Sequence, residues 1–61
     1  MYVHAYRAYE LSEDGHVISR RDLPYYLNDE TAKTHARQLV DGHTIELWDG
    51  ALLIERFEPR D

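Results

Sequence analysis

The sequence predicts an α+β fold in the order ββαββ, in which two antiparallel hairpins form one sheet and a single helix covers one face. Two β-rich segments flank a turn signal near the N-terminus, and two more flank an Asp-Gly pair near the C-terminus. The segment between them carries apolar residues at helical spacing. A chain of 61 residues has room for one domain, which we expect to span residues 1–61.

The first hairpin is predicted over residues 2–21. The segment YVHAYRAYEL, residues 2–11, is rich in Tyr and Val and contains neither Gly nor Pro, which favours a strand. The segment SEDG is a turn signal, because Gly15 adopts positive φ without a steric penalty. The segment HVISRR, residues 16–21, then resumes as a second strand.

The helix is predicted within NDETAKTHARQLVDG, residues 28–42, over about 12 residues. Asn28 is a suitable N-cap because its side chain can accept from a free backbone amide in the first turn. Asp29 and Glu30 place negative charge at the positive end of the helix dipole. Gly42 is expected to end the helix in a left-handed conformation. The apolar residues at helical spacing are Ala32, Ala36, Leu39 and Val40.

The second hairpin is predicted around Asp49 and Gly50. The segment HTIELW, residues 43–48, alternates polar and apolar side chains, and ALLIERF, residues 51–57, is rich in β-forming residues. An Asp-Gly pair between two such runs is a strong hairpin signal. Pro59 is expected to stop the last strand.

The charge and composition disfavour several classes of function. The net charge is −5 with acids and bases interspersed, which lacks the basic stripe of a nucleic-acid-binding protein. No apolar run is long enough to span a membrane, and the N-terminus lacks the pattern of a signal peptide, so we expect a cytoplasmic protein. The absence of cysteine excludes disulfides and thiolate zinc sites.

Two long segments carry a resemblance. The stretches YRAYELSEDGHVISRRDL and ARQLVDGHTIELWDGALLIERFEP contain Tyr-Arg-x-Tyr, two copies of Asp-Gly-His, and Glu-Leu-Trp-x-Gly. In these features the chain resembles a group of very short hypothetical proteins common in rhizobia-like α-proteobacteria. The resemblance covers nearly the whole chain and implies a bacterial, cytoplasmic protein. The group has no assigned activity, so no catalytic residues carry over from it.

Both faces of the predicted sheet carry apolar side chains, although one helix covers only one of them. An exposed apolar face usually marks an interface. We therefore predict a homodimer, or contact with another protein, through the open sheet face. Strand pairing at a sheet edge is a different mode of the same association. A peptide- or small-ligand-binding regulatory partner of a larger protein is the alternative function.

Trp48 is the leading candidate for that interface, because Trp, Tyr and Arg dominate interaction hot spots. It could equally be an aromatic lid on the end of the hairpin. Arg56 could stack on the indole through a cation–π contact. The candidate interface residues are Trp48, Ile54, Leu52, Arg56 and Tyr6.

Metal binding and catalysis receive less support from the sequence. Zinc requires three or four converging ligands, and no two histidines stand at the i, i+4 spacing of a helical site. No nucleophile motif such as Gly-x-Ser-x-Gly is present. We therefore expect neither a metal, nor a cofactor, nor enzymatic activity. The histidines weighed as ligands are His4, His16, His35 and His43.

Overall fold

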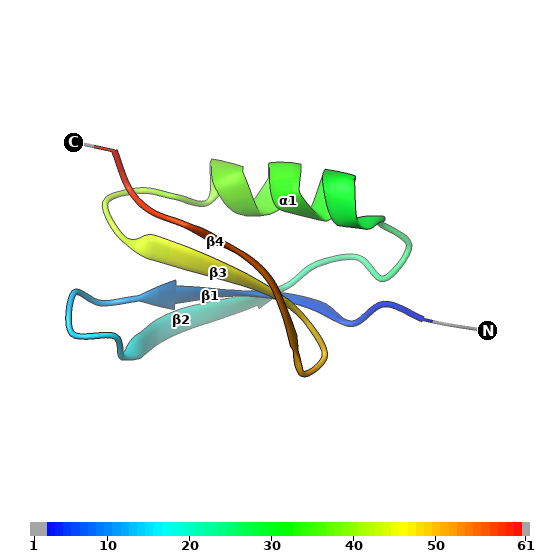
Figure 1. The fold of residues 1–61 in the computed structure, drawn as a ribbon, viewed down its shortest axis with the longest axis horizontal. Coiled ribbons are helices and arrows are strands. Elements are labelled where there is room, and N and C mark those ends of the chain that lie inside the picture. The colour runs from blue at the N-terminus through cyan, green and yellow to red at the C-terminus, as the bar shows by residue number, and fades with distance from the viewer. Residues whose placement is uncertain (1–2, 61) are drawn as a thin grey trace.

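The computed structural model, which describes residues 3–60, confirms the predicted α+β architecture. Four strands form one antiparallel sheet, and a single helix lies along one side of it (Figure 1). The elements in chain order are β1 (Tyr6–Leu11), β2 (Val17–Asp22), α1 (Asp29–Gln38), β3 (Thr44–Asp49) and β4 (Leu52–Phe57).

The strand order across the sheet is β2-β1-β3-β4, so each hairpin provides one central strand and one edge strand. β1 and β3 pair in the middle, with Ala8 opposite Leu47 and Tyr9 opposite Glu46. The connection that brings β3 beside β1 contains α1, which packs on β3 and β4. The helix therefore covers one face of the sheet mainly over the second hairpin, and the opposite face, here called the open face, has no helix over it (Figure 1).

The two hairpin turns follow the predicted turn chemistry. In the second hairpin Asp49 pairs with Leu52, which leaves a two-residue loop at Gly50 and Ala51. Gly50 has φ of 60°, a conformation that residues with a Cβ adopt only at a steric cost. The pairing of Asp49 and Leu52 fixes the register from which β4 continues.

The helix begins as predicted and ends earlier than predicted. The Asn28 side chain accepts from the Thr31 backbone amide at 2.9 Å, and the Thr31 hydroxyl accepts from the Asn28 amide at 3.0 Å, so the N-cap is reciprocal. At the other end the Leu39 amide donates to the Ala36 carbonyl at 3.0 Å, and this tighter last turn ends α1 at Gln38. Gly42, with φ of 82°, lies in the following loop rather than at the helix cap.

The first strand begins at Tyr6, later than the predicted residue 2. Residues 1 and 2 lie outside the described part. The backbone amide of Ala5 donates to the Asp49 carboxylate at 2.7 Å, a side-chain bond that replaces a ladder bond just before β1. The Ala5 carbonyl accepts from the Gly50 amide at 3.0 Å, and the chain then turns at Gly50 and Ala51, so the residues before Ala5 have no β3 residue to pair with.

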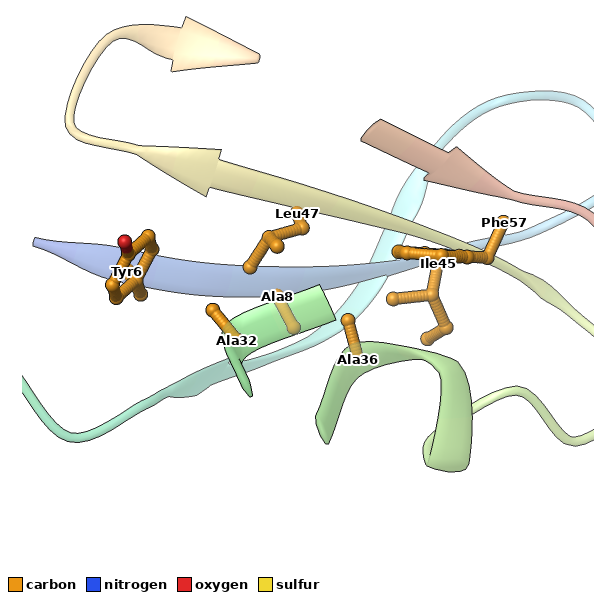
Figure 2. Packing of buried hydrophobic residues seen from close by; sticks show 7 residues of the cluster. All are labelled: Tyr6, Ala8, Ala32, Ala36, Ile45, Leu47 and Phe57. Carbon is orange, nitrogen blue, oxygen red and sulfur yellow. The ribbon is translucent and has the colours of Figure 1, made fainter. Parts of the chain in front are cut away.

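The core lies between α1 and the covered face of the sheet (Figure 2). α1 contributes only Ala32 and Ala36, both fully buried and both directed towards the side chains of the sheet (Figure 2). Such small residues let the helix approach closely but bury little apolar area, which limits the stability that burial can supply. The sheet contributes the rest of the buried cluster: Tyr6, Ala8, Ile45, Leu47 and Phe57.

Candidate interaction surface

The open face carries an apolar strip that crosses all four strands. On each central strand the residues that alternate with the buried ones point to this face, as Tyr9 does between Ala8 and Glu10. The side chains of the strip are half-buried or exposed, with Val17 57% and Leu53 44% exposed. The apolar strip consists of Val17 from β2, Tyr9 from β1, Trp48 from β3 and Leu53 from β4.

Trp48 occupies the centre of this strip and is held by two neighbours. Its ring meets Tyr9 edge to face, with centroids 6.5 Å apart and planes at 86°. Its indole N–H donates to the Glu46 carboxylate at 3.1 Å. The side chain therefore has a fixed orientation before any partner arrives. A shallow hollow of about 380 Å³ lies beside it, lined by Tyr9, Val17, Glu46, Trp48, Gly50 and Ala51.

Charged side chains of both signs border the apolar strip. On one side Arg7 of β1 donates to Asp22 of β2 at 2.7 Å. The pKa of Arg7 is raised above its ordinary value, first by a side-chain hydrogen bond with Tyr9 and then by Asp22. On the other side Arg56 of β4 lies 3.4 Å from Glu46 of β3. An apolar, aromatic centre inside a polar rim is the usual anatomy of a protein interface.

Two of the five candidate interface residues lie on the open face. Trp48 takes the central position just described. Arg56 is also there, but it pairs with Glu46 and with Glu58, at 2.9 Å from the latter. Among residues 3–60 a cation–π contact forms elsewhere, with the Arg37 guanidinium 5.4 Å from the centre of the Phe57 ring on the helix side.

The expectation that Tyr6 lies on the open face is wrong. Tyr6 is 2% exposed and belongs to the core, because it shares the covered side of β1 with Ala8. Its hydroxyl reaches the helix and donates to the Asp29 carboxylate. The long aromatic side chain thus fills space that the two helix alanines leave open.

The same expectation is wrong for Ile54 and Leu52, for a reason that lies in the strand register. The two-residue turn places Trp48 opposite Leu53, and a bulge after Leu53 places Leu47 opposite Glu55, so Ile54 has no partner of its own. Ile54 packs against the core, and Leu53 takes the place on the open face. Leu52, 62% exposed, pairs with Asp49, whose side chain points to the helix side.

Tyr9, Val17 and Leu53 are the residues of the strip that the candidate set omits. The two-residue turn pairs Asp49 with Leu52 and Trp48 with Leu53, which places Leu53 on the open face, and the bulge after Leu53 returns Arg56 to that face. For Tyr9 a signal existed in the sequence, because its parity is opposite to that of Tyr6 and Ala8. The antiparallel register that brings Tyr9 beside Trp48 depends on the long-range pairing of β1 with β3, which the local sequence does not reveal.

The four histidines do not form a common site. His16, in the first turn, lies 3.2 Å from Asp14, and His43, before β3, lies 3.1 Å from Glu10 without the alignment of a hydrogen bond. His35 is on the exposed side of α1. His4 is different, because it meets two aspartates that sequence spacing does not connect to it. The three residues of that cluster are His4, Asp29 and Asp49.

Comparison with known proteins adds no relative to this description. A scan of protein-family models finds no match, and searches of the curated proteins and of the solved structures find no significant match. Among the described residues, α1 is too short and too polar to cross a membrane, and the structure has no other helix there.

Proposed function

We propose that this chain is a small non-enzymatic interaction module that forms a homodimer through its open face. The observation that carries the proposal is the apolar strip, which crosses all four strands. Its centre is the Tyr9–Trp48 pair, which is already oriented by ring packing and by the bond to Glu46. Preorganised aromatic side chains are typical anchors of protein interfaces because little further ordering is needed on binding.

The small core supports association as a source of stability. The buried cluster between α1 and the sheet includes three alanines, and a domain of this size buries only about 60% of the surface of its unfolded chain. Covering about 400 Å² of apolar surface on each chain would supply gross stabilisation on the order of 10 kcal/mol per chain. The loss of translational and rotational freedom offsets much of it. The remainder is still large against the stability of so small a domain.

The charges around the strip favour a second copy of this chain as the partner. Although the net charge is −5, the open face carries both signs, so two copies can face each other without the repulsion of like surfaces. In a two-fold dimer each patch contacts the same patch of the other chain, which requires such self-complementarity. The charged side chains of this face are Arg7, Arg20, Asp22, Glu46 and Arg56.

Sedimentation equilibrium of two adjacent leucine variants tests the proposal. Leu53→Lys places a charge in the apolar strip, whereas Leu52→Lys places the same charge next to it but on the other side of the sheet. Wild type and Leu52→Lys should sediment as dimers at hundreds of micromolar, and Leu53→Lys as a monomer. Circular dichroism confirms that both variants fold.

Three outcomes would contradict it. A wild-type chain that is monomeric at these concentrations would rule out the homodimer. If Leu53→Lys still forms a dimer, the contact lies at the exposed edge strand β2 or at the edge strand β4 and not on the open face. Binding only to a peptide or other protein supports the alternative function of a regulatory partner. The lack of enzymatic activity and the cytoplasmic location stay predictions from the sequence.

A further inference from the structure

Three side chains that can bind a metal ion meet on the helix side of the sheet. His4 precedes β1, Asp29 begins α1 and Asp49 ends β3, and one ligand atom from each lies within 4.8 Å of the others. We propose that this His4–Asp29–Asp49 cluster binds a divalent transition metal ion, with Zn²⁺ as the best match. The inference goes beyond dimer formation and does not depend on it, because the open face takes no part in the cluster.

Asp49 is the fixed ligand of the cluster. Its side chain is 5% exposed, and its Oδ1 accepts from the Ala5 backbone amide at 2.7 Å. Its Oδ2 lies 2.7 Å from Nδ1 of His4. A buried carboxylate is costly unless its oxygens are paired, and here one oxygen is held by the backbone while the other meets an imidazole. Such outer hydrogen bonds orient the ligands of metal sites.

Tyr6 orients the other two ligands. Its hydroxyl donates to Oδ1 of Asp29, which leaves Oδ2 of that carboxylate for another interaction. Its ring stacks on the imidazole of His4, with centroids 4.6 Å apart and an angle of 17° between the planes. One core side chain therefore supports both an imidazole ligand and a carboxylate ligand, as the outer residues of metal sites do.

The donor set favours zinc over calcium or magnesium. One imidazole nitrogen with two carboxylates suits a borderline ion, whereas Ca²⁺ and Mg²⁺ prefer oxygen ligands alone. Three protein ligands would leave a further position for water. In a tetrahedral site the ligand atoms stand about 3.4 Å apart. His4 Nδ1 and Asp49 Oδ2 would therefore separate slightly as the ion replaced the proton between them, and the exposed Asp29 would move inwards.

Calorimetric titration of the metal-free chain with zinc chloride at neutral pH tests the inference, with Asp29→Asn and Glu30→Gln as matched variants. Both remove one negative charge from the first turn of α1, but only Asp29 belongs to the cluster. Wild type and Glu30→Gln should bind one Zn²⁺ per chain. Asp29→Asn should bind it more than about tenfold more weakly. NMR should show a zinc-induced shift of the His4 ring signals.

Several results would overturn the inference. One is the absence of saturable binding at hundreds of micromolar Zn²⁺. Another is an equal loss of affinity in Asp29→Asn and Glu30→Gln, which would indicate general charge attraction. A third is zinc binding that His43→Gln abolishes and Asp29→Asn leaves intact, because the ion would then bind at His43 and Glu10. Dimer formation is measured separately, so failure here leaves that proposal unaffected.

Discussion

Trp48 and Tyr9 meet edge to face on the open side of the sheet, with ring centroids 6.5 Å apart. They are diagonal neighbours on β3 and β1, because Trp48 pairs with Arg7 and Tyr9 pairs with Glu46. The Glu46 carboxylate accepts from the indole and also lies 3.4 Å from Arg56. The aromatic pair on the open face is thus connected through Glu46 to the charged residues that border it.

Trp48 fluorescence should report dissociation of the dimer. The chain contains one tryptophan, which is half-buried in the single chain and would be covered in the proposed dimer. Dilution of the wild type from hundreds of micromolar should therefore move the emission to longer wavelength as water reaches the indole. The Leu53→Lys variant should show the long-wavelength spectrum at every concentration. A wild-type spectrum that is unchanged by dilution would disagree with an interface at Trp48.

Replacing the N-cap residue, Asn28→Ala, should lower the free energy of unfolding by about 1 kcal/mol. The substitution removes the side-chain acceptor of the Thr31 amide, a first-turn donor that has no partner within the helix. Urea denaturation measures the change. Thr34→Ala is the control, because Thr34 is exposed within α1 and its hydroxyl only donates to the Glu30 carbonyl. Equal losses in both variants would show that the cap has no special role.

Asp49→Ala in metal-free buffer should lower the free energy of unfolding by about 1–3 kcal/mol. The substitution removes the buried carboxylate that accepts from the Ala5 amide and meets His4, and both contacts tie the segment before β1 to β3. Asp41→Ala, at an exposed loop position, should change stability by less than about 0.5 kcal/mol. Chemical denaturation measures the free energy of unfolding of both variants. An unchanged value for Asp49→Ala would contradict the structural role of the carboxylate.

The Ser12 hydroxyl should control the titration of Asp14. It donates to the Asp14 carboxylate and is the largest cause of the lowered pKa of that group, whose ordinary value is 3.8. Because the pKa of Asp14 is lower in the folded chain than in the unfolded chain, the interaction stabilises the fold at pH values above the ordinary pKa of 3.8. The contribution disappears as the pH falls through the folded pKa.

Carbon-detected NMR titration of Ser12→Ala should therefore place the pKa of Asp14 closer to 3.8 than in the wild type. Ser19→Ala is the control, because Ser19 donates to Glu10 at 2.8 Å in the adjacent hairpin strand. Its effect on the pKa of Asp14 should be negligible. An unchanged Asp14 titration in Ser12→Ala would contradict the assigned cause.

The fold was predictable because local signals agree with one another. Asn28 caps the helix where its side chain suggests, and Gly50 marks the hairpin turn. The errors occur where a tertiary contact or an irregularity changes a local preference. The strand starts late because its partner β3 turns at Gly50, and the helix ends at Gln38 because its last turn tightens.

The surface was predictable in part. The excess of apolar side chains over what one helix can cover points to an open face, and Trp48 lies at its centre. The two-residue turn at Gly50 and Ala51 sets Leu53 opposite Trp48, so hairpin register selects Leu53 rather than Ile54, whereas parity taken without the turn does not. The bulge after Leu53, which returns Arg56 to the open face, has no local signal such as glycine. The cluster of His4 with Asp29 and Asp49 joins three segments distant in sequence, so spacing rules for metal ligands do not detect it.

Isotope-filtered NMR on a mixture of labelled and unlabelled chains tests the proposed interface most directly. Intermolecular contacts are observed only between a labelled and an unlabelled copy, so they locate the surface residue by residue. A homodimer through the open face predicts such contacts between the Trp48 ring of one chain and the methyl groups of Val17 or Leu53 of the other. Intermolecular contacts confined to the β2 edge, or none at hundreds of micromolar, would contradict it.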